Sequence, residues 1–288
     1  MLDVTRLRVL VAVARHGSVT AAAEALHYAQ PSVSHHLARL EAETGAQLVQ
    51  RVGRGVRLTP AGRLLAERGE EILGRLSSAE AELAEHSGLR AGWVRLAAFP
   101  SALGSFVPLA AARFAEAHPD VTLQFVEAEP PLALRLLRSG EVDLSVIFDF
   151  SDKSNDGLRV TPLFTEALHL VTRPGRSGEL ADFARARWIA GCERCRESLV
   201  RRCATAGFAP DIAFTTDDYV AVQALVAAGL GVTILPELAL RAHRSPDVQT
   251  VPLHGGERHV GVAAYGVPPD PPATARLLDI LVATGNGS

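Results

Sequence analysis

The chain has 288 residues, of which 48% are hydrophobic and 21% charged, a balance typical of a soluble protein with two or three domains. No run of 18 apolar residues occurs, so we expect no membrane span, and three cysteines are too few for a disulfide scaffold. The net charge of −3 is unevenly spread, because residues 1–58 carry seven arginines against four acidic residues. This basic first part favours an anionic partner.

The first segment, "MLDVTRLRVLVAVARHGS", has apolar residues at the spacing of one helix face. Arg8 and Arg15 interrupt it, and no small-residue cleavage site follows. The segment is therefore not typical of a signal peptide, and we expect a cytoplasmic protein.

Two short helices are predicted next. Ser18 is suited to cap a helix that runs to about His27, and the alanines at 21–23 let another helix approach closely. After a turn, Pro31 suits the first position of the second helix, where its missing N–H costs nothing. Gly45 is expected to end this second helix.

The second helix has an apolar and a polar side. The spacing i, i+4 and i+7 predicts an inward face formed by Val33, Leu37 and Leu40. The other side carries hydrogen-bonding side chains, namely Ser32, His35, His36 and Arg39. Any one of these alone is more typical of a solvated surface. Together, on a helix that follows a short helix with small residues, they predict a helix-turn-helix that reads the major groove of DNA.

A two-stranded wing is predicted after this motif. The stretch "QLVQRVGRGVRLTPAG" alternates in polarity and turns at residues 53–55. Arg51, Arg54 and Arg57 would then be available to DNA phosphates.

Residues 1–87 resemble the N-terminal part of a LysR-type transcriptional regulator. The resemblance is carried by "LRVLVAVARHGSVTAAAEALHYAQPSVSHHLARLEAETGAQLVQR" followed by "GRGVRLTPAG". It implies that residues 30–39 enter the major groove of double-stranded DNA and that the wing touches the backbone. The family often has arginine at the position of His35, so the base preference of this chain is open. The candidate DNA-binding residues are Ser18, Thr20, Gln30, Pro31, Ser32, Ser34, His35, His36, Arg39, Arg51, Arg54 and Arg57.

A long helix is expected from Pro60, capped by Thr59, to about Ser87, a length of roughly 40 Å. A narrow apolar stripe runs along it, formed by Leu65, Ile72, Leu76, Ala79 and Leu83. Such a stripe needs a partner, either the rest of the same chain or a second copy. The resemblance implies a linker helix that assembles homodimers or homotetramers. Gly88 and Gly92 are expected to mark a hinge.

From Trp93 onward, strands alternate with helices in two successive rounds, which predicts α/β sheets with parallel strands. The order of elements, with "ALVAAGLGVTILPE", resembles the effector-binding half of the same family, which is built like a periplasmic binding protein. The expected domains are a winged helix-turn-helix (1–58), a linker helix (59–87) and an effector-binding domain (92–288). The last comprises subdomain I (92–161 and 266–288) and subdomain II (162–265).

A cleft between the two subdomains is the expected site for a small-molecule effector. The candidates follow strands or begin helices, and they are Phe99, Pro100, Ser101, Phe148, Asp149, Gly191, Cys192, Thr216 and Asp217. The free N–H groups of the helix at Ser101 would favour an anion. Ser101 is equally typical of a helix cap, and Asp217 and Asp218 are more typical of carboxylates that begin a helix.

The segment "GCERCRESLVRRC" holds all three cysteines. A helix start and nearby arginines would favour a thiolate at Cys192, although Glu193 works against it. One interpretation is that Cys192 contacts the effector or senses oxidants. The alternative is that Cys192 and Cys195 fill small spaces and Cys203 lies in the core. No fourth ligand supports a zinc site.

No catalytic, metal-binding or nucleotide-binding motif occurs, so we expect neither an enzyme nor a cofactor. The alternative to a regulator is a solute-binding or thiol-redox protein whose N-terminal helices serve assembly only.

Overall fold

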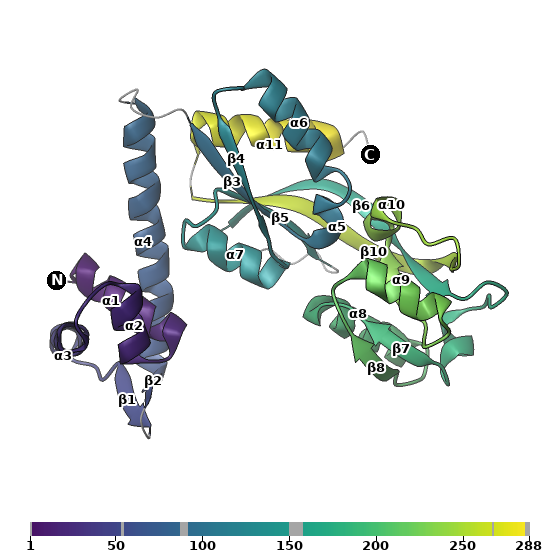
Figure 1. Cartoon of the computed structure of the whole chain (residues 1–288), viewed down its shortest axis with the longest axis horizontal. Coiled ribbons are helices and arrows are strands. Elements are labelled where there is room, and N and C mark those ends of the chain that lie inside the picture. Colours follow the sequence, from purple (N-terminus) through teal and green to yellow (C-terminus); the bar gives the residue numbers. More distant parts are fainter. Residues whose placement is uncertain (1, 53–54, 87–91, 150–157, 267, 286–288) are drawn as a thin grey trace. The chain divides into compact units, whose positions relative to one another are not determined.

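The computed structural model describes residues 2–52, 55–86, 92–149, 158–266 and 268–285. The chain divides into two compact units, one built from residues 1–90 and the other from most of the remaining chain. Figure 1 shows a small helical unit with one long helix, and a larger unit with a central sheet. No helix within the described ranges is long and apolar enough to cross a membrane.

Three helices pack around one core in the first unit. They are α1 (Val4–His16), α2 (Val19–Ala25) and α3 (Gln30–Thr44). Ser18 caps α2, because its hydroxyl accepts a hydrogen bond from the backbone N–H of Ala21 at 3.3 Å. The predicted inward residues Val33, Leu37 and Leu40 are all buried against α1 and α2.

The ends of α3 depart slightly from the prediction. The helix begins at Gln30, so Pro31 is its second residue and not its first. Gly45 ends the helix as predicted, with a φ of 65° in the left-handed region, where glycine avoids the strain that a Cβ brings.

The predicted wing is present as β1 (Val49–Val52) paired antiparallel with β2 (Gly55–Leu58). Its base is fixed by Glu41 of α3, whose carboxylate accepts the backbone N–H groups of Leu48 and Val49 at 2.8 and 3.1 Å. The wing is thereby tied to α3 through the backbone.

The long helix α4 (Pro60–His86) follows β2 directly, and Thr59 caps it through the N–H of Gly62 at 3.0 Å. At Gly62 the helix lies against the backbone of Leu48, where an added Cβ would be only 2.0 Å from the Leu48 carbonyl oxygen. Leu65 packs into the core of the first unit and so does not belong to the outward stripe. Among the side chains of α4 that the structure describes, the large exposed apolar ones are Leu64, Ile72, Leu76 and Leu83, and Ala79 of the predicted stripe is also exposed.

The second unit contains a six-stranded sheet in the order β4-β3-β5-β10-β6-β9. Its parallel part is β3 (Trp93–Ala98), β4 (Thr122–Glu127) and β5 (Leu144–Asp149). Two long strands, β6 (Leu158–Thr172) and β10 (Gln249–Tyr265), run antiparallel to each other, and β10 also pairs antiparallel with β5. The sheet is therefore mixed, whereas the sequence predicted parallel strands.

Helices cover this part of the sheet. They are α5 (Pro100–Leu103), α6 (Val107–Ala117), α7 (Pro130–Arg138) and α11 (Pro272–Gly285). Figure 1 shows α6 and α11 side by side, and the two helices join the same hydrophobic core through Phe114 and Leu281.

A second group of elements gathers at the other end of β6 and β10. Its strands are β7 (Arg187–Ala190), β8 (Asp211–Thr215) and β9 (Thr233–Pro236). Its helices are α8 (Glu193–Thr205), α9 (Tyr219–Ala227), α10 (Glu237–Ala242) and a short 3-10 turn, η1 (Leu180–Phe183). A parallel bridge between Trp188 and Val232 joins β7 to the start of β9.

The two long strands pass through both groups of elements, so the expected division at 161/162 falls inside β6. Residues 259–263 of β10 pair with β5 in the first group, although the sequence assigned them to subdomain II. Residues 168–171 of β6 pair with β9 in the second group. The chain passes from one group to the other within these continuous strands. No turn residue therefore marks the boundary in the sequence.

Candidate functional site

One candidate site is the outward side of α3. Ser32, Ser34, His35 and Arg39 are exposed, and His36 is half-buried. Arg39 forms no ion pair with a carboxylate in the described part of the chain, so its guanidinium is available to an external anion. Sequence reasoning did not include Tyr28, an exposed side chain whose ring centroid lies 6.0 Å from that of His36.

The other predicted DNA-binding residues differ in whether their side chains are exposed or already hydrogen-bonded within the chain. Thr20, Gln30 and Pro31 are exposed, whereas the hydroxyl of Ser18 is already used as a helix cap. Arg57 is exposed on β2 of the wing. The backbone of Arg51 lies in β1, and Arg54 falls outside the described residues.

The other candidate site is a small cavity of about 60 Å³ in the second unit. It lies where the strands end and helices begin in both groups of elements. Eight of the nine predicted effector-binding residues line it, namely Phe99, Pro100, Ser101, Phe148, Gly191, Cys192, Thr216 and Asp217. A volume of this size holds a few water molecules or a very small ligand.

Asp149 is the predicted effector-binding residue that is absent from the lining of this cavity. Successive residues of a strand face opposite sides, so Phe148 turns toward the cavity and Asp149 away from it. The Asp149 carboxylate lies 4.0 Å from the guanidinium of Arg194.

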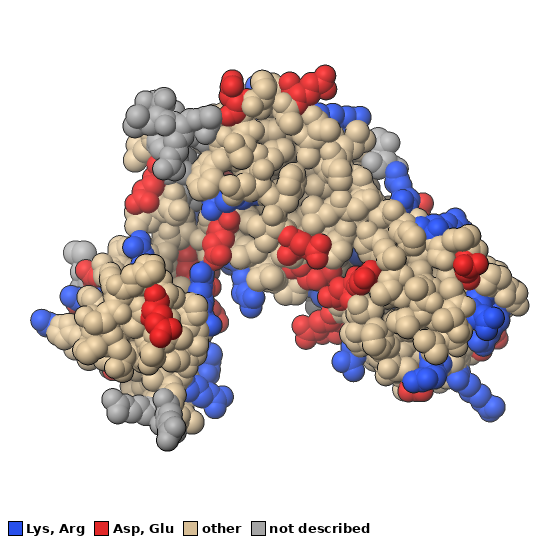
Figure 2. Space-filling view, viewed as in Figure 1, with Lys and Arg blue, Asp and Glu red and all other residues tan. Residues whose placement is uncertain are grey.

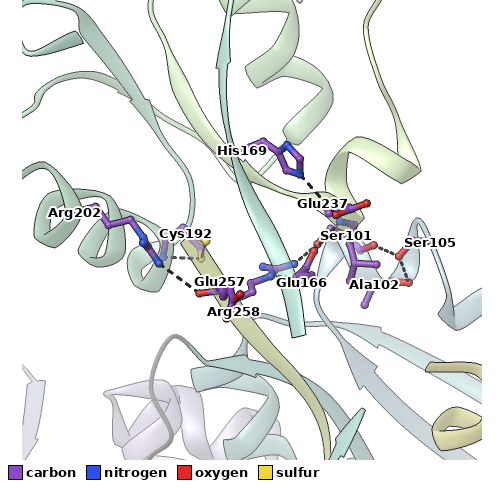
Figure 3. A network of polar contacts seen from close by, with 12 residues as sticks. Ser101, Ala102, Ser105, Glu166, His169, Cys192, Arg202, Glu237, Glu257 and Arg258 are labelled. Atoms are coloured by element: carbon purple, nitrogen blue, oxygen red, sulfur yellow. Dashed lines mark hydrogen bonds and ion pairs between the residues drawn. The ribbon is translucent and has the colours of Figure 1, made fainter. Parts of the chain in front are cut away.

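A buried ion pair lies beside the cavity, and its arginine is one of the lining residues. Arg258 of β10 and Glu166 of β6 stand opposite each other in the strand register, with Nε to Oε1 at 2.5 Å. Arg258 also donates to the hydroxyl of Ser101 at 3.0 Å, and its guanidinium lies 4.8 and 4.3 Å from the ring centroids of Phe99 and Phe148. Figure 3 shows Arg258, Glu166 and Ser101 pointing toward one another. Sequence reasoning missed this arginine and its carboxylate.

The expected anion site at the start of α5 is not supported. The helix has only four residues, and the N–H groups of Ala102 and Leu103 already donate to the carbonyl of Phe99 at 3.0 and 3.1 Å. Ser101 does not cap α5 either, because its hydroxyl accepts from Arg258.

Glu129, also missed by the sequence analysis, lines the cavity just before α7. Its Oε2 atom is buried without a hydrogen-bond partner within the described ranges. Burial raises the pKa of this carboxyl above its ordinary value. Of the two predicted aspartates, Asp217 lines the cavity, whereas Asp218 caps α9 by accepting the N–H groups of Val220 and Ala221.

The cysteines correct the thiolate expectation. Cys192 caps α8, and its sulfur lies 2.9 Å from that of Cys195. The hydrogen bond with Cys195 and burial raise the pKa of Cys192, so its thiol is neutral at pH 7. Cys203 is a core residue, and burial raises its pKa to about 11. The described residues contain no group of three His, Cys, Asp or Glu side chains placed to hold a metal.

The sequence matches two family models. Residues 4–63 match the bacterial regulatory helix-turn-helix protein, lysR family, and residues 87–286 match the LysR substrate binding domain. Together these two regions include both candidate sites.

Individual relatives agree with these matches. The chain is 30% identical over 284 residues to YcgK of Bacillus subtilis (strain 168), an uncharacterized HTH-type transcriptional regulator, with 86% of this chain and 83% of the relative covered. It is 31% identical over 277 residues to a probable hydrogen peroxide-inducible genes activator of Mycobacterium avium, with 91% and 83% covered.

The fold is also that of a solved regulator. The crystal structure of CbnR, a LysR family transcriptional regulator, matches with a TM-score of 0.66 at 22% identity and covers 99% of each chain. Full-length CbnR complexed with its target DNA matches with a TM-score of 0.64 at 23% identity, covering 98% of this chain and 100% of that one. With both family models matched, the chain belongs to the LysR family of transcriptional regulators, with a DNA-binding helix-turn-helix and an effector-binding domain.

Proposed function

We propose that this regulator reads DNA with the outward side of α3 and senses a very small effector in the cavity beside Arg258. The observation that carries the proposal is that the cavity collects residues from both groups of elements in the second unit. A ligand there contacts both groups at once, so its binding energy favours one relative arrangement of them. The protein is expected to act in the cytoplasm, where its DNA lies.

We propose that some of the side chains contact base edges and that others contact phosphates. Ser32, Ser34 and His35 supply hydrogen-bonding groups for base edges. Arg39 and the wing residue Arg57 are exposed, and neither pairs with a carboxylate of the described residues, so both suit phosphates. CbnR has been solved on its target DNA, which supports this use of the shared fold.

Assembly is proposed to use the exposed stripe of α4. Ile72, Leu76 and Leu83 lie on one helix face, and Leu83 is 71% exposed in the single chain. A helix 27 residues long with such a stripe gains free energy when a second copy covers it. We propose a homodimer, or a homotetramer made of two such dimers.

The effector is proposed to present a hydrogen-bond donor or a positive charge. Arg258 is the only cationic residue in the cavity lining that the structure describes, and Glu166 already neutralises it. Glu129 offers a buried oxygen without a partner, and Asp217 adds a second carboxylate. A small anion would face both carboxylates with no free cation to receive it.

A thiol-redox role is the second candidate, because the sulfurs of Cys192 and Cys195 are 2.9 Å apart. The name of the Mycobacterium avium relative also refers to hydrogen peroxide. The raised pKa of Cys192 opposes it, because the thiolate is the form that reacts.

Substitutions on α3 test the DNA proposal. Arg39→Ala should weaken binding to every DNA sequence and reduce the salt slope by about 1, since one phosphate contact is lost. Ser34→Ala or His35→Ala should instead change the preference among sequences by about 1–3 kcal/mol for each lost base contact. Gel shifts at several salt concentrations, on fragments found by genome-wide mapping of bound sites, measure both effects.

Arg276→Ala, which removes an exposed arginine of the second unit, is the control and should leave affinity unchanged. A fragment without residues 1–58 should not bind these sites. Retained binding by that fragment contradicts the assignment.

Substitutions on α4 test assembly. Leu76→Asp and Leu83→Asp should each dissociate the dimer, because burying an unpaired carboxylate costs several kcal/mol. Ser77→Asp places the same charge about 100° around the helix from Leu76, away from the apolar stripe, and should leave the mass unchanged. Light scattering measures the mass of each variant. A dimer that persists in both leucine variants would place the interface elsewhere.

Glu129→Gln tests the effector site. With its pKa raised in the folded state, the carboxyl destabilises the protein increasingly as pH rises above its ordinary pKa of 4.5. The glutamine removes this charge, so its advantage in free energy of unfolding over the wild type should be larger at pH 8 than at pH 5. Urea unfolding at both pH values measures this.

The variant should also bind mapped DNA sites normally while losing the regulation seen in cells. Glu127→Gln, a nearby carboxylate outside the cavity lining, is the control. Full regulation in Glu129→Gln would exclude a role for this carboxyl in effector binding.

Alkylation tests the thiol-redox candidate. Cys192 should react slowly with iodoacetamide in the native protein at pH 7, because its raised pKa leaves little thiolate. The same residue should react fully in urea, and mass spectrometry measures both. Rapid native labelling, or labelling that mild peroxide abolishes, would instead favour redox sensing.

A further inference from the structure

A second recess in the effector-binding domain shares no lining residue with the effector cavity. It has a volume of about 510 Å³ and is lined by Arg173, Arg176, Arg185 and Arg187, with Asp182 as its acidic residue. We call it the arginine groove. Three segments form it: the turn after β6, the link from η1 to β7, and the loop from α9 to β9. Figure 2 shows blue side chains gathered over this end of the second unit, with a few acidic ones between them.

The four arginines lack counter-charges. None of them forms an ion pair with a carboxylate in the part of the chain that the structure describes. Asp182 forms no ion pair with these arginines, and its Oδ2 atom accepts the backbone N–H of Glu179 at 2.9 Å. The groove lining therefore carries four positive charges against the single negative charge of Asp182.

The segments carrying these side chains are held by specific contacts. Arg173 lies against Gly229, where an added Cβ would be 2.9 Å from Nη1 of the arginine. The guanidinium of Arg176 lies 5.4 Å from the ring centroid of Phe183. The carbonyl of Arg187 accepts the N–H of Val232 at 2.9 Å, which fixes the start of β7 beside the α9–β9 loop.

We propose that the arginine groove binds a small polyanion that carries phosphate groups, such as a nucleotide or a phosphorylated metabolite. Guanidinium groups match phosphate oxygens with paired hydrogen bonds, and four around one recess can receive more than one phosphate. The volume lies within the range of small-molecule sites, while the charge of the lining selects a polar ligand. The groove is thus a second ligand site, independent of the effector cavity.

The recess favours a compact anion over a DNA backbone. The arginines converge on one hollow, whereas a duplex presents its phosphates as an extended row along each strand. Binding of DNA at this place is treated as an opposing outcome in the experiment below.

Isothermal titration calorimetry of the full chain with pyrophosphate, in phosphate-free buffer at 150 mM salt, tests the proposal. Pyrophosphate should bind, and Arg173→Gln combined with Arg187→Gln should weaken binding by at least about tenfold, since two charge-assisted contacts are lost. ATP and sulfate as further probes distinguish a nucleotide or diphosphate site from a general dianion site.

Two controls locate the binding. Arg196→Gln removes an exposed arginine of α8 outside the groove, and Arg39→Gln removes a proposed DNA contact, so both should keep wild-type affinity for pyrophosphate. Circular dichroism checks that the double variant is folded. Failure of pyrophosphate, ATP and sulfate to bind the wild type at millimolar concentration overturns the proposal. Unchanged affinity of the double variant for pyrophosphate also overturns it. A loss of DNA affinity in the double variant overturns it as well, because the groove would then be a DNA contact.

Discussion

The pairing of β6 with β10 holds the effector-binding domain together, and the Arg258–Glu166 contact lies inside it. These strands belong to both groups of elements, so each group folds against a strand pair that the other also uses. A buried ion pair adds little net stability compared with apolar side chains, but removal of one partner leaves an unpaired buried charge and costs about 3–5 kcal/mol. The pair therefore fixes register and arrangement more than it adds free energy. Glu166 also connects this strand pair to α10, because its carboxylate accepts the backbone N–H of Leu238 at 2.7 Å.

This pair also bears on the proposed effector, because it changes the charge that the cavity presents. An arginine in a ligand cavity ordinarily indicates an anionic ligand, but here the charge of the guanidinium is paired with Glu166, and the group also donates to Ser101 and lies against two aromatic rings. The cavity is left with hydrogen-bond acceptors and no free cation among the described residues. Positive charge without a partner is found instead in the arginine groove, at a different place in the same domain.

Much of the architecture follows from local rules that one sequence carries. Caps and end signals such as Ser18, Gly45 and Thr59 act within a few residues, so they could be located without a structure. Eight of the eighteen residues that line the cavity could be predicted, because ligand sites form where strands end and helices begin. Glu166 and Arg258 could not, because they are 92 residues apart and meet only through the register of two long antiparallel strands. The sequence also did not show that α5 has only four residues, or that the N–H groups of Ala102 and Leu103 donate to the carbonyl of Phe99.

The close contact between Gly62 and Leu48 has a mechanical consequence for regulation. No side chain separates the start of α4 from the strand that enters the wing, so the helix cannot swivel there without moving the wing. The helix-turn-helix, the wing and α4 then act as one rigid lever about 40 Å long. If α4 tilts by roughly 5° about the end that is far from the wing, the other end moves by about 3–4 Å. This distance is comparable to the spacing of one base pair. A small movement transmitted to α4 would therefore shift the helix-turn-helix by a distance comparable to one base pair.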